Sequence, residues 1–293
     1  MHRSGFVNII GNPNVGKSTL MNALVGEKLS IITAKAQTTR HRIMGIVNGE
    51  DFQIVYSDTP GILQPHYKLQ ENMMKFVDTA IGDADVVLYV TDVVEKYDKN
   101  GDYIARLQAL TVPTILAINK IDLTTPEILE KLVDEWKLLL PNALIYPVSA
   151  LEKFNLDNVF KRVVSLLPES PPYYDKDTFT DRNLRFFASE IIREKILLNY
   201  DREVPYCTEV CVEQFRESSD CYHIEAIINV ARDSQKGIII GHKGSALKRV
   251  GTQARLEMET FFERKVNLNL FVKVNPGWRE NPRQLKKYGY IQD

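Results

Sequence analysis

The chain has 293 residues, 44% of them hydrophobic and 26% charged, an ordinary globular composition with enough apolar material for the cores of two domains. No stretch approaches the ~18 consecutive apolar residues of a membrane span, and the N-terminal apolar run is too short for a signal peptide. The net charge of −1 hides a local bias, because residues 234–287 hold 12 Lys and Arg against 4 Asp and Glu, an excess that suits a nucleic-acid partner.

The first half of the chain alternates strand-like and helix-like segments. The apolar run FVNII leads into a glycine-rich loop, after which Ser18 opens a helix that runs through Val25. RIMGIV and FQIVYS flank Asn48-Gly49, a strong hairpin turn signal, and the later runs VVLYVT, TILAIN and ALIYPVS each follow a helix-like segment. This order predicts an α/β fold with a mostly parallel sheet and one antiparallel edge pair, closed by a helix at 155–167.

The composition changes at LPESPPYYDKD, where three prolines within five residues predict a linker. Thr180 or Asp181 is expected to cap the helix that follows. Two strands, a short helix, a longer helix and a last strand then give the order α-β-β-α-α-β, an α+β domain. The predicted organisation is a first domain at 1–168, a linker at 169–181, a second domain at 182–275 and a C-terminal tail at 276–293.

The glycine-rich loop GNPNVGKS matches the pattern G-x4-G-K-S, follows a predicted strand and opens a helix. Gly11 and Gly16 let the backbone curl so that several N–H groups point at a β-phosphate. Lys17 bridges β- and γ-phosphate oxygens, and the Ser18 hydroxyl suits a magnesium ion. The motif predicts a nucleoside triphosphate site formed by Gly11, Asn12, Pro13, Asn14, Val15, Gly16, Lys17, Ser18 and Thr19.

Two later motifs indicate which base and which metal ion the site binds. SDTPG ends the second hairpin strand, where Asp58 can hold a magnesium-bound water and the Gly61 N–H can reach the γ-phosphate. NKID ends a later strand, and its Asp122 carboxylate can accept hydrogen bonds from guanine N1–H and the 2-amino group. Adenine lacks both donors and would leave the carboxylate unpaired, at a cost of roughly a few kcal/mol. Asn119 is expected to serve the other edge of the base and the neighbouring loops, while the Lys120 stem lies over the ring.

A fourth motif, SAL at 149–151, follows the last strand and offers backbone N–H groups to guanine O6. Four motifs in this order and spacing predict a guanine-nucleotide site. Beyond the glycine-rich loop, that site consists of Asp58, Thr59, Pro60, Gly61, Ile62, Asn119, Lys120, Asp122, Ser149, Ala150 and Leu151.

These motifs together resemble those of the Ras-like, translation-factor-related GTPases. The resemblance implies a P-loop domain with a six-stranded sheet, hydrolysis of GTP to GDP and phosphate, Mg2+ as cofactor, and switch segments at 30–42 and 58–75. It also implies a magnesium-ligating threonine in AQTTRHR, where Thr39 is favoured and Thr38 is the alternative. The implied metal ligands are Ser18, Thr39 and, through water, Asp58; the implied catalytic residues are Lys17, Thr39, Asp58 and Gly61.

Two positions bear on how hydrolysis proceeds. Ile62 stands where Ras-type members of the family place a water-orienting glutamine. An isoleucine side chain cannot hydrogen-bond water, so intrinsic hydrolysis is expected to be slow or to use other means. The resemblance to GTPases with a GxPNxGKS loop implies a K+ ion held by the Asn14 side chain. The alternative is that Asn14 only shapes the turn of the loop.

A second glycine-bounded loop occurs in SQKGIIIGHKGSALKRVG, residues 234–251. Its glycines are three apart with the lysine between them, and it follows a helix, so spacing and context exclude a second nucleotide site. G-x-x-G between two helices instead resembles the loop of a type II KH domain, where glycines let a single-stranded RNA backbone approach closely. The alternative is a basic helix hairpin with no ligand. The predicted RNA contacts are Lys236, Ile239, Gly241, His242, Lys243, Gly244, Lys248 and Arg249.

A Ras-like GTPase domain followed by a type II KH domain resembles the Era family over essentially the whole chain. The resemblance implies binding to the 3′ end of small-subunit ribosomal RNA, assembly of the small (30S-type) subunit, a monomeric chain and peripheral association with the cell membrane. Cys207, Cys211 and Cys221 lack the spacing of zinc or redox sites, which indicates reduced thiols in a cytoplasmic protein. The basic tail either contacts RNA or packs as a terminal extension. The competing function is a signalling-type GTPase whose KH-like domain docks protein or membrane, although the intact G-x-x-G loop favours RNA.

Overall fold

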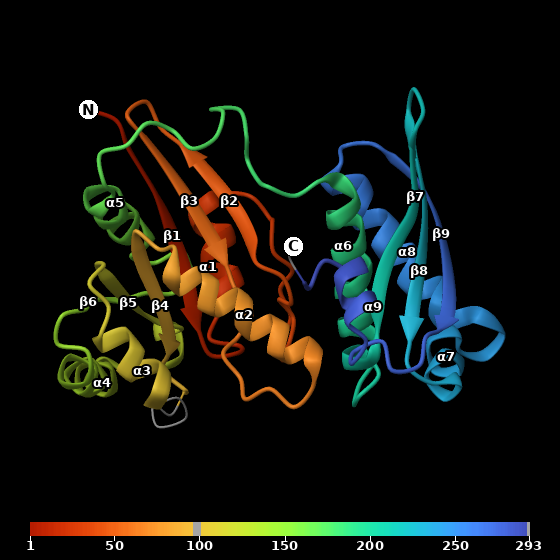
Figure 1. Ribbon diagram of the computed structural model, residues 1–293, viewed down its shortest axis with the longest axis horizontal. Helices are drawn as coiled ribbons and strands as arrows, with labels where there is room; N and C mark the ends of the chain where they lie inside the picture. The colour runs from red at the N-terminus through yellow and green to blue at the C-terminus, as the bar shows by residue number, and fades with distance from the viewer. Residues whose placement is uncertain (96–100, 292–293) are drawn as a thin grey trace. The chain divides into compact units, whose positions relative to one another are not determined.

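The computed structural model describes residues 1–95 and 101–291 (Figure 1). The chain divides into two units, each with its own sheet. The first unit consists of Met1–Ile32, Thr39–Pro65 and Met73–Asp181. The second consists of Thr33–Thr38, His66–Asn72 and Arg182–Asp293. The division therefore falls inside both predicted switch segments.

The first unit contains a six-stranded sheet in the order β2-β3-β1-β4-β5-β6. All neighbouring strands are parallel except β2 and β3, which form the hairpin that Asn48 and Gly49 predict. The α/β fold class expected from the sequence is therefore confirmed. The strands are β1 (Arg3–Gly11), β2 (Ile43–Asn48), β3 (Phe52–Asp58), β4 (Val86–Asp92), β5 (Thr114–Asn119) and β6 (Leu144–Pro147). The helices between them are α1 (Lys17–Val25), α2 (Lys68–Gly82), α3 (Gly101–Gln108), the short η2 (Ile121–Leu123), α4 (Pro126–Leu139) and α5 (Leu156–Leu166).

Burial explains why these segments adopt these structures. Every residue of β4 and β5 is buried, as expected for parallel strands covered on both faces. Helix α5 buries Leu156, Val159 and Val163, whose spacing places them on one helical face. The connection after β1 leads to the β2–β3 side of the sheet, and the connection after β3 crosses to β4 on the other side of β1. Folds of this class bind ligands at such a switch point, beyond the carboxyl ends of β1 and β4. The predicted nucleotide residues lie at this edge of the sheet.

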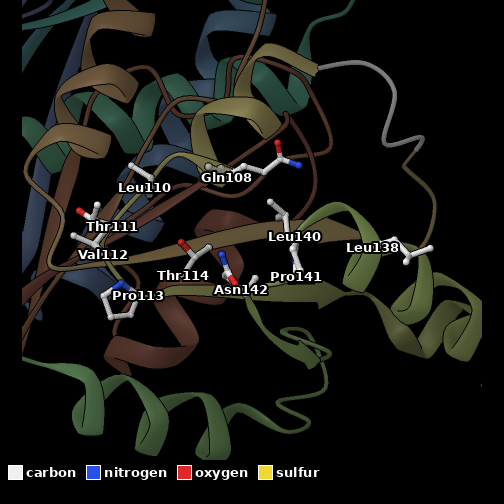
Figure 2. A pocket seen from close by; sticks show the side chains of 12 residues that line it. Gln108, Leu110, Thr111, Val112, Pro113, Thr114, Leu138, Leu140, Pro141 and Asn142 are labelled. Atoms are coloured by element: carbon white, nitrogen blue, oxygen red, sulfur yellow. The ribbon is translucent and has the colours of Figure 1, made fainter.

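A cavity of about 580 Å³ lies at the opposite, amino-terminal edge of the same sheet (Figure 2). The segments that precede β5 and β6 form it, and Thr114, Leu140 and Asn142 are among its lining side chains. None of its 12 lining residues is charged. Because an uncharged cavity cannot neutralise phosphate groups, it does not match the predicted nucleotide site.

Residues 169–181, predicted to be a linker, belong to the first unit, and residues 173–180 contact the β2–β3 hairpin. The Thr180 hydroxyl donates to Met44 O at 2.7 Å, and Ile46 N donates to Phe179 O at 2.8 Å. As an edge strand, β2 presents backbone groups on its outer side, and this segment supplies partners for them. The predicted linker segment therefore packs against the first unit at these contacts, which composition alone does not reveal.

The second unit contains a three-stranded sheet in the order β7-β8-β9. β7 and β8 are antiparallel, whereas β8 and β9 are parallel. Buried apolar residues of α6 and α8, such as Ile196 and Met258, pack with the strands in one core. The order α-β-β-α-α-β is confirmed, with α6 (Leu184–Asn199), η3 (Pro205–Cys207), β7 (Glu209–Glu217), β8 (Cys221–Val230), α7 (Asp233–Ile240), η4 (His242–Gly244), α8 (Ser245–Phe261), β9 (Lys265–Val274) and a further helix α9 (Pro282–Lys287).

Both ends of the second unit are defined by side-chain contacts. Asn183 caps α6, instead of the expected Thr180 or Asp181, and its side chain accepts a hydrogen bond from Phe186 N at 3.0 Å. In the tail, Trp278 and Tyr290 are buried, and the Trp278 indole donates to Cys207 O at 3.1 Å. Of the two roles considered for the tail, the structure shows packing as a terminal extension for these residues.

Candidate functional site

The predicted phosphate loop connects β1 to α1 and is held closely against the end of β5. Gly16 has a φ of 93°, and a Cβ there would lie 2.2 Å from Asn119 Nδ2. Asn119 Nδ2 donates to Val15 O at 2.8 Å, and Asn119 Oδ1 accepts from Ala150 N at 2.9 Å. Glycine at position 16 therefore allows the close approach through which Asn119 joins the phosphate loop to the loop after β6.

Lys17 lies within the phosphate loop with its side chain buried. Its Nζ donates to Gly11 O at 3.0 Å and to Asn12 O at 2.7 Å. Burial lowers the pKa of Lys17 to about 8, although the neighbouring carboxylates of Asp58 and Glu95 act to raise it. Phosphate oxygens carry charge and would be stronger partners for this ammonium group than the two carbonyl oxygens are.

Three oxygen-bearing side chains meet beside the loop. Ser18 Oγ donates to Asp58 Oδ2 at 2.6 Å and lies 2.9 Å from Thr39 Oγ1, which is 3.2 Å from the same carboxylate oxygen. Asp58 Oδ1 is buried and has no hydrogen-bond partner within residues 1–95 and 101–291. Burial raises the pKa of this carboxyl group, against the Ser18 hydrogen bond and the charge of Lys17. Because Mg2+ prefers oxygen ligands and keeps several waters, these residues fit a magnesium ion.

The structure separates the two candidate threonines. Thr38 Oγ1 donates to Lys35 O at 2.6 Å and lies 2.6 Å from Thr33 Oγ1. Thr39 is the one whose hydroxyl reaches Ser18 and Asp58. Geometry therefore favours Thr39 as the magnesium ligand of the first switch.

The residues expected to recognise guanine are braced by polar neighbours. Asp122 Oδ1 accepts a hydrogen bond from Ser149 Oγ at 2.6 Å. Lys120 Nζ donates to Asn14 O and to Asp92 Oδ2, each at 2.6 Å. The lysine thus links the NKID motif both to the phosphate loop and to the end of β4.

The backbone of the SAL segment is partly engaged within the protein. Ser149 N donates to Phe154 O at 3.3 Å, and Ala150 N donates to Asn119 Oδ1 at 2.9 Å. Leu151 is 73% exposed. Two of the three N–H groups expected to face guanine O6 therefore have acceptors, which they must share or release on binding the base.

Residues 59–62 run beside the phosphate loop, as the DTPG motif predicts. Thr59 Oγ1 donates to Ile9 O at 2.7 Å, and Ile62 N donates to Gly11 O at 3.1 Å. The Ile62 side chain is only 3% exposed, so it faces the core of the first unit. Neither its chemistry nor its position suits the orientation of an attacking water.

Two acidic residues that sequence reasoning missed also belong to this site. Asp92 ends β4, and Glu95 follows three residues later. Asp92 pairs with Lys120, and Glu95 Oε1 accepts a hydrogen bond from Asn12 Nδ2. Their position after a predicted strand could have revealed these two residues. Parallel neighbouring strands end at the same edge of a sheet, and β4 lies beside β1.

The second glycine-bounded loop lies between α7 and α8. Gly241 has a φ of 73°, and a Cβ there would lie 2.6 Å from Ala246 Cβ, so the packing of the loop itself requires this glycine. A Cβ at Gly244 would meet no described atom within 4 Å. His242 and Lys243, between the two glycines, are exposed. The surface at Gly244 is therefore open to the backbone of a ligand.

Positive side chains accompany this loop. Lys243, Lys248 and Arg249 are exposed, and Lys236 is half-buried. Helix α8 begins at Ser245, so its first N–H groups and the positive end of its dipole face the loop. This arrangement suits the phosphates of a nucleic-acid backbone.

Ile239, predicted to contact RNA, is fully buried in the core of the second unit. Its carbonyl oxygen accepts a hydrogen bond from Tyr200 Oη at 2.7 Å. Ile238, the preceding residue, is 49% exposed. The prediction for the Ile239 side chain is wrong because three consecutive isoleucines carry no periodicity that tells which of them faces the sheet.

Comparisons with known proteins match both units. The family described as 50S ribosome-binding GTPase matches residues 6–120, and the KH domain family matches residues 203–279. A crystal structure of Era in complex with MgGDPNP and nucleotides 1506–1542 of 16S ribosomal RNA is 38% identical, with a TM-score of 0.95 and coverage of 100% of both chains. A tyrosine-to-alanine variant of Aquifex aeolicus Era bound to GDP and AlF4− is also 38% identical, with a TM-score of 0.95 and coverage of 99% of this chain and 100% of that one.

Replacing Gly16 by alanine tests how far the phosphate loop depends on its contact with Asn119. The added Cβ would lie 2.2 Å from Asn119 Nδ2, so the loop or the asparagine must move. We expect GDP affinity, measured by fluorescence titration, to fall roughly 100-fold. Gly26→Ala is the matched control, because Gly26 has a φ of 86° but a Cβ there meets no described atom within 4 Å. Equal losses in both variants would contradict this role for the contact.

Proposed function

Since this chain belongs to the Era family of GTPases, we propose that it is a guanine-nucleotide switch that hydrolyses GTP and binds the 3′ end of small-subunit ribosomal RNA during subunit assembly. The observation that carries this conclusion is the full-length match to Era bound to MgGDPNP and 16S ribosomal RNA. The gathering of Ser18, Thr39 and Asp58 beside Lys17, and the open surface at Gly244, support it.

Each residue of the proposed GTP site has a distinct task. Lys17 exchanges its two carbonyl acceptors for β- and γ-phosphate oxygens. Ser18 and Thr39 would hold Mg2+, and Asp58 would hold one of its waters. The metal ion would supply positive charge where negative charge builds up on the phosphate oxygens. The Gly61 N–H donates to the γ-phosphate. A group other than Ile62 must orient the attacking water.

Asp122→Asn tests the proposed recognition of guanine. The asparagine amide donates where the carboxylate accepts, so it opposes the guanine 2-amino group and matches the 2-oxo group of xanthine. We expect GTP affinity to fall roughly 100-fold or more and xanthosine triphosphate to bind instead, as measured by competition against fluorescent GDP. The side-chain oxygen that accepts from Ser149 is kept in this variant. Unchanged GTP affinity would refute the assignment of Asp122.

The double variant His242→Asp with Lys243→Asp tests RNA binding by the second unit. It keeps both glycines, and aspartate tolerates the left-handed conformation of Lys243, whose φ is 49°. Negative charge at the phosphate track should weaken binding of single-stranded RNA roughly tenfold or more in a filter assay, with GDP binding unchanged. Lys131→Asp with Lys137→Asp, at exposed positions of α4, is the control for reversal of charge elsewhere. If RNA affinity survives in the first variant, or falls equally in both, RNA is not held at this loop.

We also propose that Asn14 holds K+ beside the β- and γ-phosphates, in support of hydrolysis. Its φ of 66° is a conformation that asparagine tolerates, which agrees equally with a role in the turn alone. Asn14→Gly separates the two roles, because glycine keeps the turn and removes the side-chain oxygen. We expect GTP turnover to be several-fold faster in K+ than in Na+, and the difference to vanish in Asn14→Gly while GTP still binds. Equal turnover of the unmodified protein in both salts, at matched ionic strength, would exclude the site.

The remaining parts of the proposal rest on the family resemblance. They are a monomeric chain, a cytoplasmic location and peripheral association with the inner face of the cell membrane. Among the described residues, no helix is both long and apolar enough to cross a membrane. The competing function, docking of protein or membrane by the second unit, is less favoured because the G-x-x-G loop is intact and basic side chains accompany it.

A further inference from the structure

The end of β4 holds the phosphate loop at two separate points. Asp92 Oδ2 binds Lys120 Nζ at 2.6 Å, and the same ammonium group donates to Asn14 O at 2.6 Å. Glu95 reaches the other limb of the loop, where its Oε1 accepts a hydrogen bond from Asn12 Nδ2. The proposed roles in nucleotide binding account for Lys120 and Asn14 but leave Glu95 unexplained.

Local contacts fix the position of the Glu95 carboxylate. Its backbone N donates to Asp92 Oδ1 at 2.8 Å, which closes a turn directly after the strand. Its second carboxylate oxygen accepts from the buried Thr91 hydroxyl at 2.9 Å. Both oxygens of Glu95 are therefore engaged, one with the strand end and one with the phosphate loop.

The negative charge of Glu95 affects the nucleotide site separately from its hydrogen bonds. Glu95 is half-buried and binds the Asn12 side chain, and the carbonyl oxygen of the same Asn12 accepts a hydrogen bond from Lys17 Nζ at 2.7 Å. A nucleotide brings several negative charges to the same ammonium group. A partly buried carboxylate is screened less than a surface one, so it opposes the phosphates while it attracts Lys17.

We propose that Glu95 is a positioning residue for the phosphate loop, held through Asn12, and that its negative charge weakens the grip on nucleotide phosphates and so speeds nucleotide release. This inference rests on the proposed guanine-nucleotide site and adds a residue that sets its affinity. The competing explanation is that Glu95 only braces the loop by hydrogen bonds.

Glu95→Gln separates charge from hydrogen bonding. Glutamine has the same shape, can accept from Asn12 and can donate to the Thr91 hydroxyl, which also serves as an acceptor. If charge matters, fluorescent GDP should dissociate roughly fivefold more slowly from this variant than from the unmodified protein, when chased with excess unlabelled GDP. The gain in affinity should be larger for a non-hydrolysable GTP analogue than for GDP, because the analogue carries one more phosphate. A role in bracing alone would not produce a dependence on the number of phosphates.

Two further variants complete the test. Glu95→Ala removes the charge and the brace together, so nucleotide should leave it faster than it leaves Glu95→Gln. Glu130→Gln removes one negative charge from an exposed position of α4 and should release GDP at the unmodified rate. Release from Glu95→Gln at the unmodified rate, or an equal change for GDP and the GTP analogue, would overturn the proposal. Failure of the unmodified protein to bind guanine nucleotides would instead overturn the proposed function.

Discussion

The contact of the buried Lys17 ammonium group with oxygen atoms is the interaction on which the nucleotide site of the first unit depends. A buried charge without partners costs several kcal/mol, so the surrounding elements must supply oxygen atoms. The phosphate loop contributes the carbonyls of Gly11 and Asn12, and the ends of β3 and β4 bring the carboxylates of Asp58 and Glu95 near. Three strand ends therefore converge on one cation. The same convergence suits phosphates, because a site built to stabilise one buried positive charge presents that charge to an anion.

The two glycine-bounded loops have different surroundings. The first follows a strand and is enclosed by the NKID and DTPG segments, with Gly16 packed against Asn119. The second joins two helices, and a Cβ at Gly244 would meet no described atom within 4 Å. An enclosed loop can surround the terminal phosphates of one small molecule, whereas an open loop can follow the backbone of a longer chain. The positive φ values of Gly241 and Gly244 show that glycine serves the loop conformation there as well as the approach of a ligand.

Much of this architecture could be predicted because its signals are local. Turn residues at Asn48 and Gly49 define the hairpin, and apolar runs bounded by polar ends define the parallel strands. The spacing of each glycine loop, with the element that precedes it, distinguishes a nucleotide loop from a KH loop. The features that the sequence did not reveal depend on neighbours distant in sequence. Segment 169–181 contacts an edge strand that composition does not indicate, and Ile239 lies in a core that a run of isoleucines does not indicate.

By itself, the sequence determined the order of the elements, the two loops and the chemical groups offered to a nucleotide and to RNA. Only the tertiary structure decided that Thr39, rather than Thr38, meets Ser18 and Asp58. It alone showed that Glu95 reaches Asn12, since that contact exists only because β4 lies beside β1. The physical reason is the range of the forces involved. Backbone conformation and periodicity act over a few residues, whereas the partners of a buried charge are set by which strand ends the fold brings together.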